Sequence, residues 1–210
     1  NDSEGVAQIP GVAGVLGNDQ KIKLVDFIHE LEGKKNYSPN PLIRIDRLSS
    51  VPPPLLNGFE SRTRAFVQIQ QGCDQSCTFC VIHRARGLSK SMNMLEILHQ
   101  IKTFVKSGYK EIVLCGVDLG SFESGIEKKS HKLPIVDLMK TIASMDGDFR
   151  IRLSSIDPFH MSDDLFHIIA ESDRFCPYLH VSLQSGSTLI LKRMKRRYDR
   201  EFLLDRLDKA

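Results

Sequence analysis

The sequence predicts an α/β fold with a parallel sheet of about four βα units, preceded by a small α/β unit. From residue 65 onwards, short apolar runs of strand length alternate with longer segments whose apolar residues recur at the helical period. Small or polar residues follow each apolar run, as expected where parallel strands end at a shared rim. The composition, 41% hydrophobic and 26% charged over 210 residues, is that of a globular chain with one sizeable core.

Residues 1–33 are expected to form the small unit, as the C-terminal remnant of a preceding domain. An apolar run at residues 10–17 leads to a turn, and Asn18 or Asp19 is placed to cap the helix that follows. The apolar residues of that helix recur at the helical period: Leu24, Phe27, Ile28 and Leu31. Residues 34–62, rich in proline and weakly periodic, are predicted to be a linker.

The main domain is expected to occupy residues 63–210. Its predicted elements are, in order, a strand at 65–70, a helix at 92–107, a strand at 111–116, a helix at 133–145, a strand at 149–156, a helix at 163–172, a strand at 177–186 and the start of a helix at 199–210. The first of these helices is expected to bury one apolar face: Leu95, Leu98, Ile101, Phe104 and Val105.

The candidate functional residues follow the four predicted strands. They are the cysteines after residue 70, Gly116–Gly120, Ser154 with Ser155, and Gln184–Gly186. Because the carboxyl ends of parallel strands meet at one edge of the sheet, we expect these groups to converge there.

Three cysteines, Cys73, Cys77 and Cys80, form a C-x3-C-x2-C motif after the first strand. A cubane iron–sulfur cluster has four irons, so three thiolates leave one iron without a protein ligand. An open coordination position is typical of a catalytic metal site, where a substrate or cofactor binds. The aromatic Phe79 is expected to screen such a cluster from water.

Other interpretations of the cysteines stay open. A structural zinc site usually needs a second cysteine pair or a histidine pair, whereas Cys115 and Cys176 stand alone and neither His83 nor His99 has a familiar spacing. Disulfides suit small secreted chains rather than this one, with 5 cysteines in 210 residues. The residues favour an iron–sulfur cluster and leave a zinc site or unreactive thiols as alternatives.

Charge and hydropathy restrict the partners. A net charge of +3 permits an RNA partner without indicating one. No apolar run approaches the roughly 20 residues that span a bilayer. The N-terminus has neither the basic nor the apolar region of a signal peptide and lacks an initiating methionine. We therefore expect a cytoplasmic protein, without a membrane partner, that is a piece of a longer chain.

Four segments resemble the radical S-adenosylmethionine (SAM) methylthiotransferases: GCDQSCTFCVIHRARG, EIVLCGVDLGSF, RIRLSSIDP and HVSLQSGSTLILKRMKRRYDRE. The last two are most similar to the tRNA threonylcarbamoyladenosine methylthiotransferases. The resemblance implies a partial radical-SAM (β/α) barrel that carries a [4Fe-4S] cluster on three cysteines and binds S-adenosyl-L-methionine at the open iron. It implies one-electron cleavage of SAM, with an electron donor, and addition of a methylthio group to C2 of threonylcarbamoyladenosine beside the tRNA anticodon.

The resemblance also implies roles for residues outside the cysteines. Gly116 and Asp118 correspond to a loop near the methionine amine of SAM, and Ser154 and Gln184 are candidates for binding its ribose or carboxylate. Arg86 is a candidate for binding a cofactor carboxylate or an RNA phosphate. Alternatively, Gly116 serves only to close a tight turn, Ser154 caps the following loop, and Arg86 is a solvated surface residue.

A basic run near the C-terminus is a candidate for tRNA phosphates, although a solvated face is the favoured interpretation: Lys192, Arg193, Lys195, Arg196, Arg197 and Arg200.

The chain departs from the family pattern in three respects. No cysteine precedes Cys73, so the family's auxiliary cluster cannot form from this chain, and the C-terminal RNA-binding domain is absent from it. His83 stands where the family usually has proline. We therefore expect that this chain alone does not methylthiolate tRNA. A radical SAM enzyme acting on ribosomal protein or another substrate, and a zinc-bound or metal-free structural module, remain alternatives.

Overall fold

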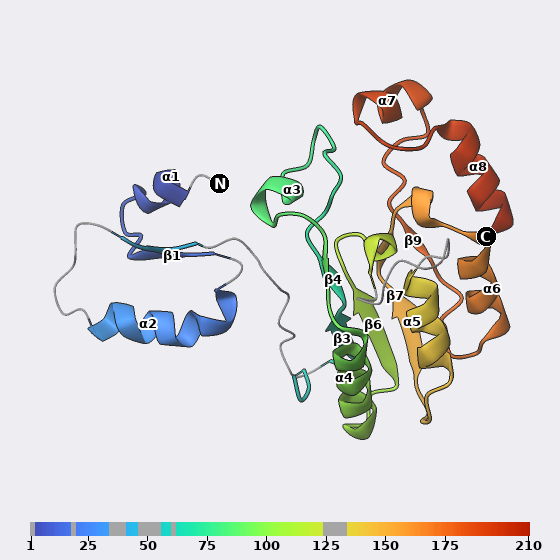
Figure 1. Ribbon diagram of the computed structural model, residues 1–210, viewed down its shortest axis with the longest axis horizontal. Helices are drawn as coiled ribbons and strands as arrows, with labels where there is room; N and C mark the ends of the chain where they lie inside the picture. Colours follow the sequence, from blue (N-terminus) through green and yellow to red (C-terminus); the bar gives the residue numbers. More distant parts are fainter. Residues whose placement is uncertain (1–2, 18–19, 34–40, 46–55, 60–61, 124–133) are drawn as a thin grey trace.

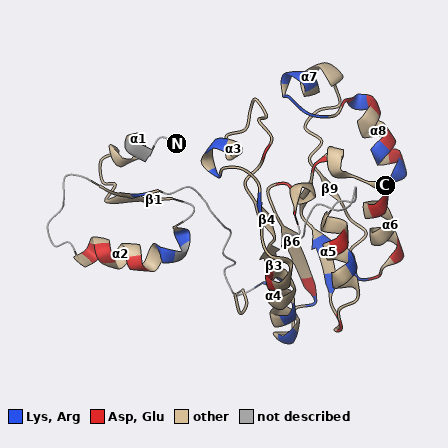
Figure 2. Ribbon diagram, in the orientation of Figure 1, with Lys and Arg blue, Asp and Glu red and all other residues tan. Residues whose placement is uncertain are grey.

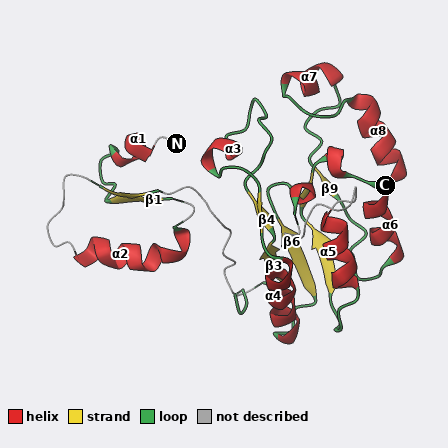
Figure 3. Ribbon diagram, viewed as in Figure 1, coloured by secondary structure: helices red, strands yellow, loops and turns green. Residues whose placement is uncertain are grey.

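A computed structural model of the protein describes residues 3–17, 20–33, 41–45, 56–59, 62–123 and 134–210. Figures 1 and 3 show a small N-terminal unit and a larger α/β body in which helices lie beside a sheet. In the described ranges, no helix has the length and apolar character needed to cross a membrane. The parallel strands and the helices between them confirm the predicted α/β class.

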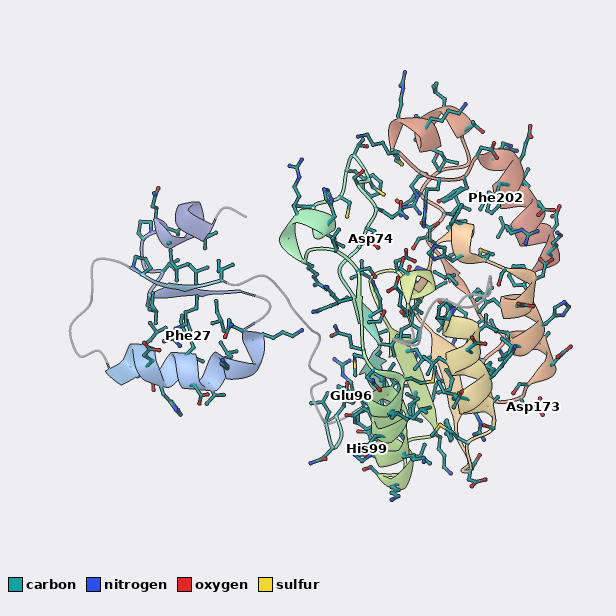
Figure 4. The ribbon with its side chains drawn as sticks, in the orientation of Figure 1. Phe27, Asp74, Glu96, His99, Asp173 and Phe202 are labelled. Atoms are coloured by element: carbon teal, nitrogen blue, oxygen red, sulfur yellow. The ribbon has the colours of Figure 1, made fainter. Side chains whose placement is uncertain are left out.

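The N-terminal unit pairs a helix with two parallel strands. Its elements are α1 (Ser3–Ala7), β1 (Gly14–Leu16), the 3-10 helix η1 (Lys21–Lys23), α2 (Leu24–Gly33) and β2 (Leu42–Arg44). Phe27 points from α2 to the strands (Figure 4), and its ring lies against Gly14, where a Cβ would come within 2.7 Å of it. The unit thus continues past residue 33, because β2 lies within the predicted linker and pairs with β1. The predicted caps, Asn18 and Asp19, lie outside the described residues.

Three parallel strands form the main sheet in the order β3-β6-β7: β3 (Arg64–Gln68), β6 (Glu111–Cys115) and β7 (Arg150–Leu153). The parallel pair β8 (Ser155–Ile156) and β9 (His180–Val181) follows. A short antiparallel pair joins β4 (Gln70–Gln71) to β5 (Lys90–Ser91). This pair closes the base of the segment that carries the three cysteines, residues 72–89, which we call the cysteine loop.

Helices and short 3-10 turns connect the strands: α3 (Ile82–Ala85), α4 (Met94–Lys106), η2 (Leu119–Ser121), α5 (Pro134–Ala143), η3 (Pro158–His160), α6 (Asp163–Glu171), α7 (Thr188–Arg193) and α8 (Arg200–Lys209). Side chains at the N-caps of α4, α6 and α8 accept hydrogen bonds from the first turn, and these are Asn93, Ser162 and Asp199. Such caps explain where these helices begin, because they satisfy N–H groups without an intrahelical partner.

The core lies between one face of the sheet and the helices. Alternate residues of β3, β6 and β7 are buried in it: Ala65, Val67, Ile112, Leu114, Ile151 and Leu153. From α4, Ile97, Ile101 and Phe104 are fully buried. The prediction that Leu95 shares this face is wrong, since its side chain is 74% exposed. Leu95 precedes Ile101 by six residues, which places it about 240° around the helix.

The segment 56–59 is bound to α4 and the turn that follows it. Gln100 exchanges two hydrogen bonds with the backbone of Leu56, and the Tyr109 hydroxyl does the same with Phe59. This segment therefore packs on the main body, although it belongs to the range 34–62 predicted as a linker.

A buried carboxylate organises the other face of the sheet. Glu111, 7% exposed, accepts hydrogen bonds from Arg152 Nε at 2.7 Å and from Arg150 Nε at 2.8 Å. Arg64 on the neighbouring strand lies 3.7 Å from the same carboxylate. The hydrogen bond from Arg152 outweighs the opposing effect of burial and, with that from Arg150, holds the pKa of Glu111 below its ordinary value.

This lowered pKa predicts how stability depends on pH. Its contribution is present above the pKa of the unfolded state, roughly 4.3, and is lost as pH falls through the lower pKa of the folded state. We expect Glu111→Gln to lower the free energy of unfolding by about 2 kcal/mol at pH 7, because one charged acceptor is removed. The difference from wild type should shrink toward pH 3, as measured by urea unfolding.

The exposed ion pair of Asp148 with Lys110 supplies the control. Asp148→Asn should change stability far less than Glu111→Gln, since solvent screens this exposed pair. A Glu111→Gln penalty that is equally large at pH 3 and pH 7 would contradict the assignment to ionised Glu111.

Candidate functional site

The three cysteines lie together on the cysteine loop. All three are free thiols; Cys77 is buried, and Cys73 and Cys80 are half-buried. The loop turns back at its start because Gly72 adopts a φ of +73° and Cys73 N–H donates to the Gly87 carbonyl at 3.1 Å. Phe79 is 54% exposed, so its ring stands in solvent instead of covering the thiols as expected.

The donor set fits a [4Fe-4S] cluster. Its three thiols come from residues 73–80 of the cysteine loop and match the three cysteine ligands of such a cluster. Burial raises the pKa of Cys73, and the charges of Asp118 and of the two other thiols raise it further. Among the described residues, no three metal-binding side chains converge on a point where one ion would sit. A cubane does not require such a point, because each thiolate binds a different iron.

A buried side chain, Gln70, joins the cysteine loop to the loop after β6. Its Nε2 donates to the Gly72 carbonyl at 2.9 Å and to Ser89 Oγ at 2.8 Å. Its Oε1 accepts from the N–H groups of Val117 at 2.9 Å and Asp118 at 3.0 Å. Gln70 therefore fixes the cysteine loop to the residues predicted to approach the methionine amine.

In the loop after β6, the Asp118 carboxylate lies close to the imidazole of His160. His160 Nδ1 lies 3.4 Å from Asp118 Oδ1, and Ser121 Oγ donates to Asp118 Oδ2 at 2.7 Å. Burial disfavours the ionised carboxylate, but His160, Ser121 and the charge of Arg197 outweigh it and hold the pKa of Asp118 below its ordinary value. The site thus holds an anionic side chain, whose charge raises the pKa of Cys73.

Two of the other predicted cofactor-binding residues share a cavity. Arg86 and Gly116 are among the residues lining a volume of about 370 Å³, together with Gln70 and Val117. Gly116 is needed there, since a Cβ would come within 3.0 Å of Gln70 Oε1. Cys115 also lines it, and burial raises the pKa of this thiol to about 11, so the thiol stays protonated and poorly nucleophilic at neutral pH.

Ser154 and Gln184 follow β7 and β9, and neither is among the residues that line this cavity. Ser154 Oγ is buried without a hydrogen-bond partner among the described residues, so it is a polar group available to a ligand. Gln184 is exposed and has a φ of +63°, a conformation that side chains other than glycine rarely adopt. Backbone strain of this kind is common at ligand sites.

The basic run divides into exposed and buried parts. Figure 2 shows basic residues on α7 and α8, and on α3 within the cysteine loop. Lys192, Arg193 and Arg200 are exposed. For Arg196 the interpretation as a solvated residue is wrong: its side chain is 8% exposed, ion-pairs with Asp157 and donates to Cys77 Sγ at 3.4 Å.

The sequence did not identify the roles of four residues that build the site, Gln70, Asp157, His160 and Arg196, and it placed Arg196 only in the basic run. Three of them act through partners far along the chain, and no local spacing identifies such pairs. A signal was available for Asp157, because an Asp-Pro pair at the start of a turn is typical of a cap, and Asp157 Oδ1 does accept from Phe159 N–H at 2.9 Å.

Comparison of the sequence and the fold with known proteins identifies the family of this chain. Residues 67–210 match the Radical SAM superfamily. The chain is 36% identical over 192 residues to the threonylcarbamoyladenosine tRNA methylthiotransferase MtaB of Rickettsia prowazekii, covering 91% of this chain and 44% of that protein. It is 38% identical over 143 residues to the tRNA-2-methylthio-N(6)-dimethylallyladenosine synthase of Nitratiruptor sp., covering 68% of this chain and 33% of that protein.

A solved structure agrees at the level of the fold. The cobalamin-dependent SAM radical enzyme OxsB, with aqua-cobalamin bound, superposes with a TM-score of 0.63 at 16% identity, covering 90% of this chain and 30% of that one. The chain thus spans less than half the length of these proteins. The parallel strands of this chain carry the cysteine loop at their carboxyl ends, and residues 67–210 match the family model. The chain therefore belongs to the radical SAM superfamily.

Proposed function

We propose that this chain is the radical SAM part of a tRNA methylthiotransferase that adds a methylthio group to C2 of threonylcarbamoyladenosine. The observation that carries the proposal is the cysteine loop at the carboxyl end of the sheet, in a chain 36% identical to a protein named for that activity. The cofactors would be S-adenosyl-L-methionine and a [4Fe-4S] cluster on Cys73, Cys77 and Cys80. The cluster would supply the electron that cleaves SAM.

The chain's own residues would bind and orient these cofactors. Asp118 is an anionic acceptor suited to the ammonium of SAM, and Gln70 holds the backbone of that loop in place. Arg86 and Gly116 line the adjoining cavity, while Ser154 and Gln184 are candidates for the ribose or carboxylate. We propose residues 63–210 as the catalytic domain, with an external electron donor, a tRNA partner and a cytoplasmic location.

The first test is the metal content after anaerobic reconstitution with iron and sulfide. We expect about four irons and four sulfides per chain, and we expect Cys77→Ala to lose the cluster. Cys176→Ala is the matched control, because Cys176 is equally buried but lies outside the cysteine loop. Bound zinc, or no metal in the wild type, would refute the proposal.

A second substrate is supported by the relative from Nitratiruptor, whose name specifies dimethylallyladenosine. The two are distinguished with the full-length protein, expressed in a bacterial strain that lacks its own methylthiotransferases. Mass spectrometry of tRNA nucleosides would then show a methylthio group on threonylcarbamoyladenosine, as proposed, or on dimethylallyladenosine.

A further inference from the structure

We propose that Arg196 is a positioning residue for the cluster: its guanidinium holds the Cys77 sulfur and raises the cluster's reduction potential. The inference rests on the proposed function, because it requires a cluster on the cysteine loop. It assigns a role to a residue 119 positions away from Cys77 in the sequence.

The guanidinium is held on every side. Nη1 donates to Cys77 Sγ at 3.4 Å, Nη2 pairs with the Asp157 carboxylate, and Nε donates to the Tyr198 hydroxyl at 3.3 Å. Its Cζ also lies 5.2 Å from the centre of the Tyr198 ring. A planar group with donors in a fixed fork suits several partners at once, so the direction of the bond to sulfur is set by the protein.

The partners of Arg196 are themselves fixed. Asp157 Oδ1 accepts from Phe159 N–H at 2.9 Å, which leaves Oδ2 for the arginine. The Tyr198 hydroxyl lies 3.1 Å from the Ser182 carbonyl and 2.9 Å from that of Leu183. Arg196 is therefore preorganised by the turns after β8 and β9.

The same segment binds the cysteine loop through its backbone. Thr78, next to Cys77, donates from its N–H to the Met194 carbonyl at 3.3 Å and from its hydroxyl to the Arg193 carbonyl at 3.1 Å. These two bonds fix the loop beside Arg196. The contact with Cys77 is thus part of an extended junction between α7 and the cysteine loop.

The electrostatic consequence has a definite sign. Reduction adds one electron to the cluster and increases the negative charge on its sulfur ligands. A guanidinium stays protonated, and its hydrogen bond to a ligand sulfur favours the more negative, reduced state. Burial strengthens this effect because water screens the charge less. Removing Arg196 should therefore make the reduction potential more negative.

The test is an anaerobic redox titration with dithionite and mediators, followed by electron paramagnetic resonance. Dithionite supplies the electron that the cluster takes up. We expect the midpoint potential of Arg196→Gln to shift to a more negative value, and Arg196→Lys to shift less, because lysine keeps the charge without the fork. Arg193→Gln is the matched control: it removes an exposed positive charge from the same segment and should leave the potential unchanged.

A purely structural role would give a different result. Arg196→Gln leaves Asp157 buried without its partner, so it lowers the melting temperature in either case. If it does not fold, the double variant Asp157→Asn with Arg196→Gln replaces the ion pair by two neutral amides. It should still shift the potential to a more negative value, but by less than Arg196→Gln, because the Asp157 charge is removed together with that of Arg196. An unchanged potential at full iron content would overturn this inference alone. A wild type that binds no cluster would overturn the proposed function as well.

Discussion

Gly72→Ala is expected to lower the free energy of unfolding by about 3–5 kcal/mol and to abolish cluster binding. Gly72 precedes the first cysteine and has a φ of +73°. A Cβ there would lie 2.1 Å from the Leu88 carbonyl oxygen, which is far closer than van der Waals contact. Since Leu88 O belongs to the backbone, no side chain can rotate away, and the two ends of the cysteine loop must separate.

The opposite end of the loop provides the control. Gly87 has a similar φ of +79°, but nothing lies within 4 Å of the position of its Cβ. Gly87→Ala therefore carries the backbone strain without the collision, which costs about 1 kcal/mol. Urea unfolding and iron content measure both variants. Equal losses for Gly72→Ala and Gly87→Ala would show that the close approach of Leu88 has no effect.

Gln70→Met has the second largest expected effect, a loss of about 3 kcal/mol in the free energy of unfolding. Gln70 is 1% exposed and bonds to both loops of the site. Methionine matches its shape but leaves the N–H groups of Val117 and Asp118 without this acceptor. An unsatisfied buried donor costs more than the bond contributes, so the loss should exceed that for an ordinary hydrogen bond.

Gln68→Met is the matched control for this variant. Gln68 lies two residues earlier, is half-buried, and donates to Gln71 Oε1 at 3.2 Å. Its replacement should cost about 1 kcal/mol. In the reconstituted protein, Gln70→Met should also release iron faster than Gln68→Met when a chelator is added. Equal release rates would mean that Gln70 does not support the cysteine loop.

The sequence was sufficient for the order of the main strands and helices, because their causes are local, but it did not predict α3, α7 or the short strands β4 and β5. Apolar periodicity identified α4, α5 and α6, and short apolar runs identified β3, β6 and β7. The parallel alternation then placed the cysteines, Gly116 and Ser154 at one end of the sheet, as the structure shows. The prediction for Leu95 was wrong because this residue, six positions before Ile101, lies about 240° around the helix and off its buried face.

The parts that could not be predicted depend on distant pairs. Gln70 lies in a run of glutamines that has no distinguishing pattern, and only the loop after β6 makes it a connector. Arg196 belongs to a run of basic residues, and only its proximity to Asp157 and Cys77 separates it from its solvated neighbours. Local composition describes a surface well, but it contains no information about which charge is buried.

The junction between α7 and the cysteine loop has a consequence for synthesis. Thr78 and Arg193 are 115 positions apart, and Cys77 and Arg196 are 119 apart. At about 5–20 residues per second, a ribosome would release the three thiols roughly 6–24 s before the segment that holds them. During that interval the cysteine loop can form the hydrogen bonds of Gln70 and Gly72, but Cys77 and Thr78 still lack their partners from the later segment. The full set of contacts around Cys77 can therefore form only after Arg196 has left the ribosome.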